Sequence, residues 1–156
     1  MAALLAVDVG LHTGLALFNA GGRLQWARSN HVASAARLRE AAPALLRLAP
    51  DVTHLYFEGG GQLADIWRRA GEKRGLALVQ VSAETWRPAI LFDRERHNGP
   101  MAKQHADKLA RNVFLWSGLK PPKAMRDDTA EAILIGLYGV LQLGWLDALP
   151  EPLRRL

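Results

Sequence analysis

Four acidic residues, Asp8, Glu58, Asp128 and Glu131, are spaced so that their carboxylates could converge on divalent cations. Asp8 ends an apolar run that starts near residue 3, and Glu58 ends a second apolar run just before three consecutive glycines. A carboxylate at the end of a buried strand loses hydration, and a cation or a hydrogen-bond donor must offset that loss. Carboxylate oxygens are the ligands that Mg²⁺ prefers. The pattern therefore indicates a magnesium site built from separated parts of the chain.

The remaining two acids lie at the start of a long apolar segment that is typical of a buried helix. Asp128 and Glu131 are three residues apart, so on a helix they share one face. The same spacing allows an ordinary role, in which Asp128 caps the helix and Glu131 completes a capping box. Asp127 is a third candidate for the cap. In the same way, Asp8 and Glu58 could be solvated strand ends beside turns.

Basic residues indicate a polyanionic partner. The net charge is +5 and the sequence pI is about 10.1, which suits nucleic acid. One segment next to Trp67 concentrates this charge in four residues, Arg68, Arg69, Lys73 and Arg74. These side chains either follow a phosphate backbone or form a solvated helix face.

The elements that must position these residues follow from the apolar periodicity and the turn signals. Ser34 is the expected cap of the first helix, and the segment 82–100 reads as an irregular, charged surface loop. We expect strands at 3–8, 14–19, 23–28, 53–58 and 76–81, and helices at about 34–48, 62–74, 101–116 and 127–143. With 156 residues, 49% of them hydrophobic, the chain is long enough for one domain, residues 1–156, with a sizeable core.

Several classes of protein are excluded or disfavoured. There are no cysteines, which excludes disulfides and thiolate zinc sites. No apolar run approaches the roughly 20 residues that span a bilayer, and the N-terminus lacks the pattern of a secretory signal. We therefore expect a cytoplasmic protein with no membrane partner, either bacterial or made by a phage in its host.

Taken in order, the motifs resemble one family, the RuvC-like Holliday junction resolvases, particularly the short phage and prophage forms. The likeness covers about residues 3 to 143. It rests on Val7-Asp8-Val9-Gly10 with Thr13-Gly14-Leu15-Ala16, on Tyr56-Phe57-Glu58, on the segment 82–87 followed by Lys103, and on Asp128-Thr129-Ala130-Glu131. Family members often have aspartate where this chain has Glu131. They also have an aromatic or apolar wedge where this chain has glycines 59–61, and the nearest candidates here are Leu63, Ile66 and Trp67.

The resemblance implies an α/β, ribonuclease H-like fold, with a five-stranded mixed sheet of three antiparallel and then parallel strands, flanked by helices. It implies a crossover junction endodeoxyribonuclease that resolves four-way DNA junctions by paired symmetric nicks leaving 5′-phosphates. Two Mg²⁺ ions per site, replaceable by Mn²⁺, would be held by Asp8, Glu58, Asp128 and Glu131. Lys103 would stabilise charge on the phosphate.

The resemblance also implies a homodimer that binds branched DNA. The residues expected to contact DNA are Arg68, Arg69, Lys73, Arg74, Trp86, Arg87 and Lys103. Two alternatives stay open. One is a ribonuclease H-like nuclease that acts on flaps, forks or RNA. The other is a non-catalytic scaffold that keeps the fold and binds nucleic acid or a protein.

Overall fold

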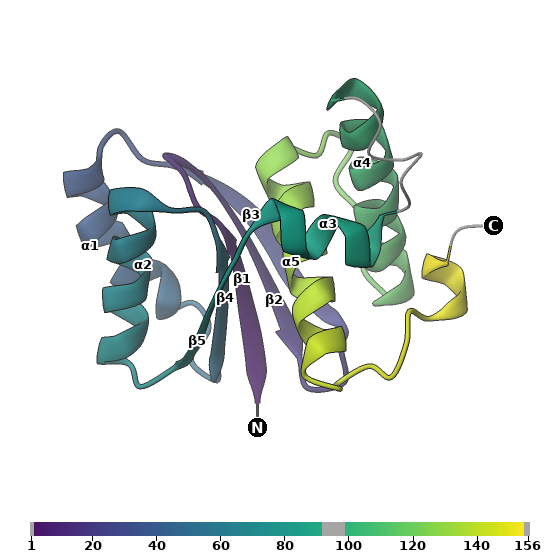
Figure 1. The fold of residues 1–156 in the computed structure, drawn as a ribbon, viewed down its shortest axis with the longest axis horizontal. Helices are drawn as coiled ribbons and strands as arrows, with labels where there is room; N and C mark the ends of the chain where they lie inside the picture. Colours follow the sequence, from purple (N-terminus) through teal and green to yellow (C-terminus); the bar gives the residue numbers. More distant parts are fainter. Residues whose placement is uncertain (1, 92–98, 155–156) are drawn as a thin grey trace.

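The computed structural model describes residues 2–91 and 99–154, which form a sheet with helices packed against it (Figure 1). No helix of these residues is long and apolar enough to cross a membrane. The elements are β1 (Ala3–Asp8), β2 (His12–Asn19), β3 (Leu24–His31), α1 (Ala35–Leu46), β4 (His54–Glu58), α2 (Gly61–Lys73), β5 (Ala77–Val81), α3 (Ala83–Ile90), α4 (Gly99–Trp116), α5 (Asp127–Gln142) and a short 3-10 turn, η2 (Glu151–Leu153).

The five strands form one mixed sheet in the order β3-β2-β1-β4-β5. The pairs β1–β2 and β2–β3 are antiparallel, whereas β1–β4 and β4–β5 are parallel. The predicted fold class, a ribonuclease H-like sheet of three antiparallel and then parallel strands, is confirmed. In this register Asp8 is paired with Glu58 on one side and with Gly14 on the other. The ends of β1 and β4 therefore lie next to each other.

Helices cover both faces of the sheet, with α1 and α2 on one face and α3, α4 and α5 on the other (Figure 1). Each face has its own apolar core. The cap of α1 is Ser34, whose side chain accepts a hydrogen bond from the Arg37 backbone N–H, as the sequence predicted. The residues that α1 buries are Leu38, Ala42, Leu45 and Leu46.

Helix α5 packs very close to the sheet because glycines face it. A Cβ on Gly14 of β2 would lie 1.8 Å from the backbone oxygen of Asp128, which is an impossible contact. Gly136 of α5 lies similarly close to the Phe18 ring, where a Cβ would meet a ring carbon at 2.2 Å. The first turn of α5 is thus fixed against the start of β2, and this fixes the position from which its acidic side chains extend.

One sequence prediction is wrong in the region 82–91. This part of the expected loop is the helix α3, which buries Trp86 and Ile90. Pro88 lies inside α3. A proline in a helix interior removes a hydrogen bond, so the sequence did not indicate a helix here. The rest of the expected loop, residues 92–98, lies outside the described residues.

Candidate functional site

The carboxyl ends of β1 and β4 bring two acids together. Asp8 and Glu58 are in-register partners of parallel strands, and the backbone N–H of Val9 donates to the Glu58 carbonyl at 3.0 Å. The two side chains are close enough to hydrogen-bond to each other. Two carboxylates this close repel each other when both are charged, which favours the protonated form of Asp8.

The surroundings of Asp8 disfavour its charged form. Burial, the largest cause, and the nearby charges of Glu58, Glu131 and Asp128 raise the pKa of Asp8 to about 8. Burial also raises the pKa of Glu131, although the neighbouring Arg87 opposes the shift. Like charges held in one partly buried space are costly unless a cation compensates them. The four acids singled out in the sequence therefore lie within electrostatic reach of one another.

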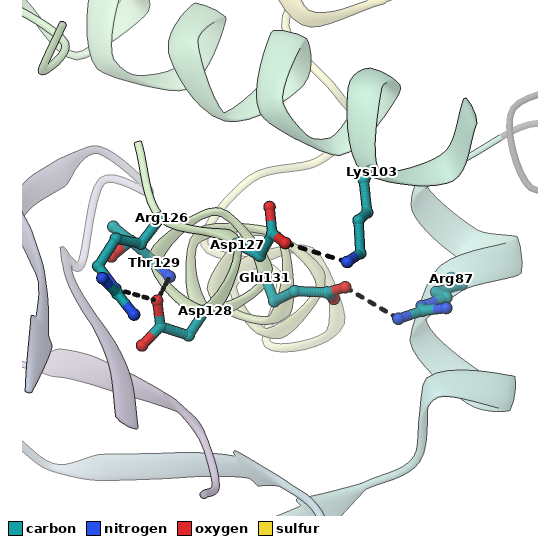
Figure 2. A network of polar contacts seen from close by, with 7 residues as sticks. All are labelled: Arg87, Lys103, Arg126, Asp127, Asp128, Thr129 and Glu131. Atoms are coloured by element: carbon teal, nitrogen blue, oxygen red, sulfur yellow. Dashed lines mark hydrogen bonds and ion pairs between the residues drawn. The ribbon is translucent and has the colours of Figure 1, made fainter. Parts of the chain in front are cut away.

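Glu131 and Asp127 are paired with cations from the neighbouring helices (Figure 2). Arg87 Nη2 on α3 lies 2.9 Å from Glu131 Oε1, and Lys103 Nζ on α4 lies 3.2 Å from Asp127 Oδ2. Glu131 is the more shielded of the two acids, because its side chain is 22% exposed against 66% for Asp127. The α3–α4 side of the site thus supplies positive charge directly to the acids of α5.

Asp128 is held by a different set of partners. Its Oδ2 accepts a hydrogen bond from Ser29 Oγ on β3 at 2.5 Å, and its Oδ1 accepts from the Thr129 backbone N–H at 3.0 Å. Arg126 Nε lies 3.7 Å from the same Oδ1 (Figure 2). The carboxylate is only 10% exposed, and these contacts fix its orientation.

The ordinary alternative, in which Asp128 and Glu131 form a capping box, is wrong. Arg126 is the cap residue of α5, and no side chain makes a capping hydrogen bond there. Asp127 is the first residue of the helix and does not cap it either. The carboxylates of Asp127, Asp128 and Glu131 are therefore not used to cap α5.

An open hollow of about 550 Å³ connects these groups. Most of the residues that line it are charged: Asp8, His12, Lys103, Met125, Arg126, Asp127, Asp128 and Glu131. Lys103, expected from the sequence near the phosphate, lines this hollow. As the side chains stand, no three carboxylate or imidazole groups of the described residues are arranged to hold one metal ion.

The prediction that Trp86 contacts DNA needs correction. Trp86 is 1% exposed and packs in the core between α3 and the helices behind it, so its ring offers no surface to a ligand. Two of the candidates for a wedge, Ile66 and Trp67, are buried as well, with Trp67 at 0%. Both belong to the apolar side of α2, whose exposed side carries the charges. Leu63 is partly buried against the same core.

The basic residues of α2 differ in their surroundings. Arg68 is engaged, because its guanidinium hydrogen-bonds to both Asp65 and Gln80. Arg69 and Lys73 instead border a hollow of about 210 Å³ between α1 and α2, together with Arg39. Arg74 is the C-cap residue of α2.

Sequence reasoning missed several side chains of the site. Ser29, the partner of Asp128, lies opposite Gly14 across the β2–β3 pair. His12 stacks on His31 with ring centroids 4.3 Å apart, and Arg126 Nη2 lies 3.3 Å from His12 Nδ1. The register of the β2–β3 hairpin was the signal that could have placed these residues beside the acids.

Comparison with solved structures identifies the fold. T. thermophilus RuvC in complex with a Holliday junction substrate matches with a TM-score of 0.69 at 13% identity, over 92% of this chain and 96% of that one. The catalytic core of BIV integrase (TM-score 0.36, 15% identity, 86% and 80% covered) and a chain of a simian T-cell lymphotropic virus intasome (0.38, 12%, 85% and 46%) are more distant. No family model and no curated protein matches the sequence. The chain is therefore RuvC-like in fold.

Proposed function

We propose that this chain is a single-domain, Mg²⁺-dependent endonuclease that cleaves branched DNA, with four-way junctions as its substrate. One observation carries the proposal: β1, β4 and α5 bring Asp8, Glu58, Asp128 and Glu131 to one partly buried place. There, burial and then the charges of the other three acids raise the pKa of Asp8 to about 8. Such a concentration of acid destabilises the metal-free protein, and a binding site for cations gives a reason to keep it.

The donor set fits hard divalent cations. All four candidate ligands are carboxylates, and oxygen ligands are those that Mg²⁺ and Mn²⁺ take. In and beside the hollow, the five acids Asp8, Glu58, Asp127, Asp128 and Glu131 face the three cations Arg87, Lys103 and Arg126. When all are ionised, negative charge is in excess. Bound Mg²⁺ ions would supply Lewis-acid activation of water and of the phosphate.

The other side chains of the site have positioning roles in this proposal. Ser29 keeps the Asp128 carboxylate oriented, and Arg87 holds Glu131 until a cation replaces it. Lys103 lines the hollow with 67% of its side chain exposed, so its ammonium can contact a phosphate oxygen and stabilise developing charge.

Three observations support branched DNA as the substrate. The structural neighbour at TM-score 0.69 is a RuvC bound to a Holliday junction, and the net charge of +5 suits a polyanion. The exposed Arg69 and Lys73 on α2 can contact phosphates outside the hollow. A four-way junction has two-fold symmetry, so we also propose a homodimer whose two sites make paired nicks leaving 5′-phosphates.

The test is cleavage of an end-labelled four-way junction in Mg²⁺, beside linear duplex, flap and RNA–DNA hybrid. Asp8→Asn should abolish cleavage, and Asp51→Asn, at an exposed turn residue away from the site, should leave it unchanged. Cleavage of flaps or hybrids in place of junctions would keep the metal site and replace the substrate. Junction binding without cleavage of any substrate would remove the nuclease proposal.

A non-catalytic scaffold is the second candidate, and the ion pairs of the site favour it. Arg87 and Lys103 already neutralise Glu131 and Asp127, so part of the acidity is balanced without any metal. A scaffold should show the same melting temperature with and without Mg²⁺. A nuclease should be stabilised by Mg²⁺, because a cation that binds only the folded state raises its stability.

A further inference from the structure

A second and larger hollow opens beside Glu58. Its volume is about 650 Å³, and it shares no lining residue with the acidic hollow, although Glu58 at its border is the in-register neighbour of Asp8 in that hollow. The residues around it come from β4, β5, α3, α5 and the β4–α2 turn: Glu58, Gly59, Gly60, Val79, Gln80, Val81, Ser82, Thr85, Tyr138 and Gln142.

The hollow exists because β5 is an edge strand that the helices leave partly uncovered. Val79 and Val81 pack toward the α5 side of the sheet and give the hollow apolar surface. Ser82 and Thr85, whose hydroxyls lie 3.0 Å apart, border it where α3 begins. The hollow thus combines a small apolar area with polar groups at its border, which is how sites for small polar molecules are built.

A chain of hydrogen bonds anchors the α5 wall of this hollow to the core. The buried Tyr56 hydroxyl donates to Gln142 Oε1 at 2.6 Å, and Gln142 Nε2 donates to the Tyr138 hydroxyl at 3.2 Å. With its oxygen accepting from Gln142, the Tyr138 hydroxyl keeps its own proton to donate. The chain therefore orients a hydrogen-bond donor and an aromatic ring at the wall of the hollow.

The opposite wall is also held in place. Gln80 Nε2 donates to the Gly59 carbonyl at 2.6 Å, while Gln80 Oε1 accepts from Arg68. Next to this contact, Gly60 lines the hollow and has only open space where a Cβ would be. A larger side chain at Gly60 can therefore reach into the hollow without disturbing the core.

We propose that this hollow holds one unstacked nucleobase, from the nucleotide next to the phosphodiester that the acids cleave. This inference rests on the proposed nuclease function and deepens it. A nucleobase has flat apolar faces and a polar edge, which match the valine surface, the Tyr138 ring and the ordered hydroxyl and amide groups. Glu58 borders the hollow and is the in-register neighbour of Asp8, so the hollow lies next to the acids.

The hollow gives a physical reason for selecting branched DNA. Taking a base out of a duplex costs free energy, and the cost is least for a base that is already unpaired or mismatched. A base at a branch point has lost part of its stacking and pairing. Such a base can enter the hollow at a lower cost in free energy than a base within a continuous duplex. A continuous duplex would therefore bind with the hollow empty.

The test uses 2-aminopurine, an adenine analogue whose fluorescence increases when it leaves the base stack. Asp8→Asn protein in Mg²⁺, which keeps the junction intact, is mixed with junctions that carry the probe at each position around the branch. We expect one position beside the cleavage site to brighten severalfold. Gly60→Leu, which fills the hollow, should remove this increase, and Gly60→Ala is the matched control that should retain it.

A second measurement uses Tyr138→Phe in the otherwise wild-type chain, with cleavage of junctions that differ in the base beside the cut. Loss of one neutral hydrogen bond should reduce the preference among bases by roughly two- to tenfold. One contrary outcome is that the protein binds and cleaves the junction while 2-aminopurine brightens at no position, or brightens equally in Gly60→Leu. Either result would overturn the hollow as a site for a base and would leave the proposed nuclease function intact. Absence of both binding and cleavage of the junction would overturn the proposed function, and this inference with it.

Discussion

Asp8 is the residue whose charge the fold opposes most strongly, and replacing it should stabilise the metal-free protein. Its pKa is raised from 3.8 to about 8. Below pH of about 4 the carboxyl is protonated in the folded and unfolded states alike. As pH rises toward 8, the unfolded state loses this proton first, so the wild-type protein becomes less stable across this window.

Asp8→Asn removes this penalty. In EDTA, the variant should melt at a higher temperature than the wild type, and the difference should grow between pH 5 and 8. Each kcal/mol corresponds to about 2–4 °C for a chain of this size. Mg²⁺ should then stabilise the wild type more than Asp8→Asn. A variant that melts below the wild type at pH 8 in EDTA would show that the pair Asp8–Glu58 is stabilising instead.

Arg87 and Mg²⁺ should compete for Glu131, and this competition can be measured by calorimetry. The ion pair is 2.9 Å long and partly exposed, so its loss in Arg87→Met should cost only about 0.5–1 kcal/mol in EDTA. Without the guanidinium, Glu131 is free for a cation, and the variant should bind Mg²⁺ more tightly than the wild type. Arg68→Met, which breaks a pair with Asp65 away from the acids, is the control. Equal Mg²⁺ affinity in all three proteins would show that Arg87 does not compete.

Part of the site could be predicted from single residues, and part could not. Asp8 and Glu58 were visible because each ends an apolar strand, where a charge is out of place. Ser29 carried no such signal, because a serine in a strand is ordinary until the fold brings it to an acid. Arg87 was expected to contact DNA, and its pairing with Glu131 was not visible in the sequence. Trp86 was expected to contact DNA because of the family resemblance, and its burial at 1% exposure places it in the core instead.

At the scale of elements, strand ends and caps were predictable because local chemistry determines them. Strand β1 has the predicted bounds, and Ser34 caps α1 as expected. Helix α3 was missed because its stability comes from tertiary packing of Trp86 and Ile90, which outweighs the penalty of Pro88. The close approach of α5 to β2 was also invisible, because a Thr-Gly pair in a strand gives no sign of what lies above it.

This close approach leads to a prediction about Gly14. A methyl group there would lie 1.8 Å from the Asp128 carbonyl oxygen, so Gly14→Ala must push the first turn of α5 away from the sheet. Overpacking of this kind costs roughly 1–3 kcal/mol. Because the turn carries Asp128 and leads to Glu131, Mg²⁺ affinity should fall as well. Denaturant unfolding and calorimetry of Gly14→Ala check both effects.

Gly60→Ala is the matched control for this substitution, since nothing lies within 4 Å of its added Cβ. It should change the free energy of unfolding by less than about 0.5 kcal/mol. If Gly14→Ala were equally harmless, α5 would not be fixed by its contact with β2, and the position of Asp128 would need another explanation.

At the scale of the whole molecule, the basic charge is unevenly distributed. The segments 35–47 and 61–74, which make up α1 and α2 with their C-caps, contain seven arginines and lysines against three acids. On the other face, two cations beside the acidic hollow are paired with acids, in Arg87–Glu131 and Lys103–Asp127. The α1–α2 face therefore offers positive charge to phosphates that lie outside the acidic hollow.

Two residues of this face should contribute directly to DNA affinity. Arg69 and Lys73 border the hollow between α1 and α2, about 12 and 18 Å along α2 from its first residue. Each phosphate contact adds close to one unit to the slope of log K against log salt. In Arg69→Gln/Lys73→Gln, the slope for junction binding should therefore fall by about two, with weaker binding at low salt.

The control must remove the same charge elsewhere. Lys120→Gln/Arg154→Gln does so at two exposed residues outside α1 and α2, and it should change the slope little. Fluorescence anisotropy with a labelled junction, measured from 50 to 300 mM salt, separates the two cases, because net charge alone would affect both variants equally. Equal slopes in the two double variants would mean that DNA does not lie along α2. Arg69 and Lys73 would then contribute only to the overall charge of the protein.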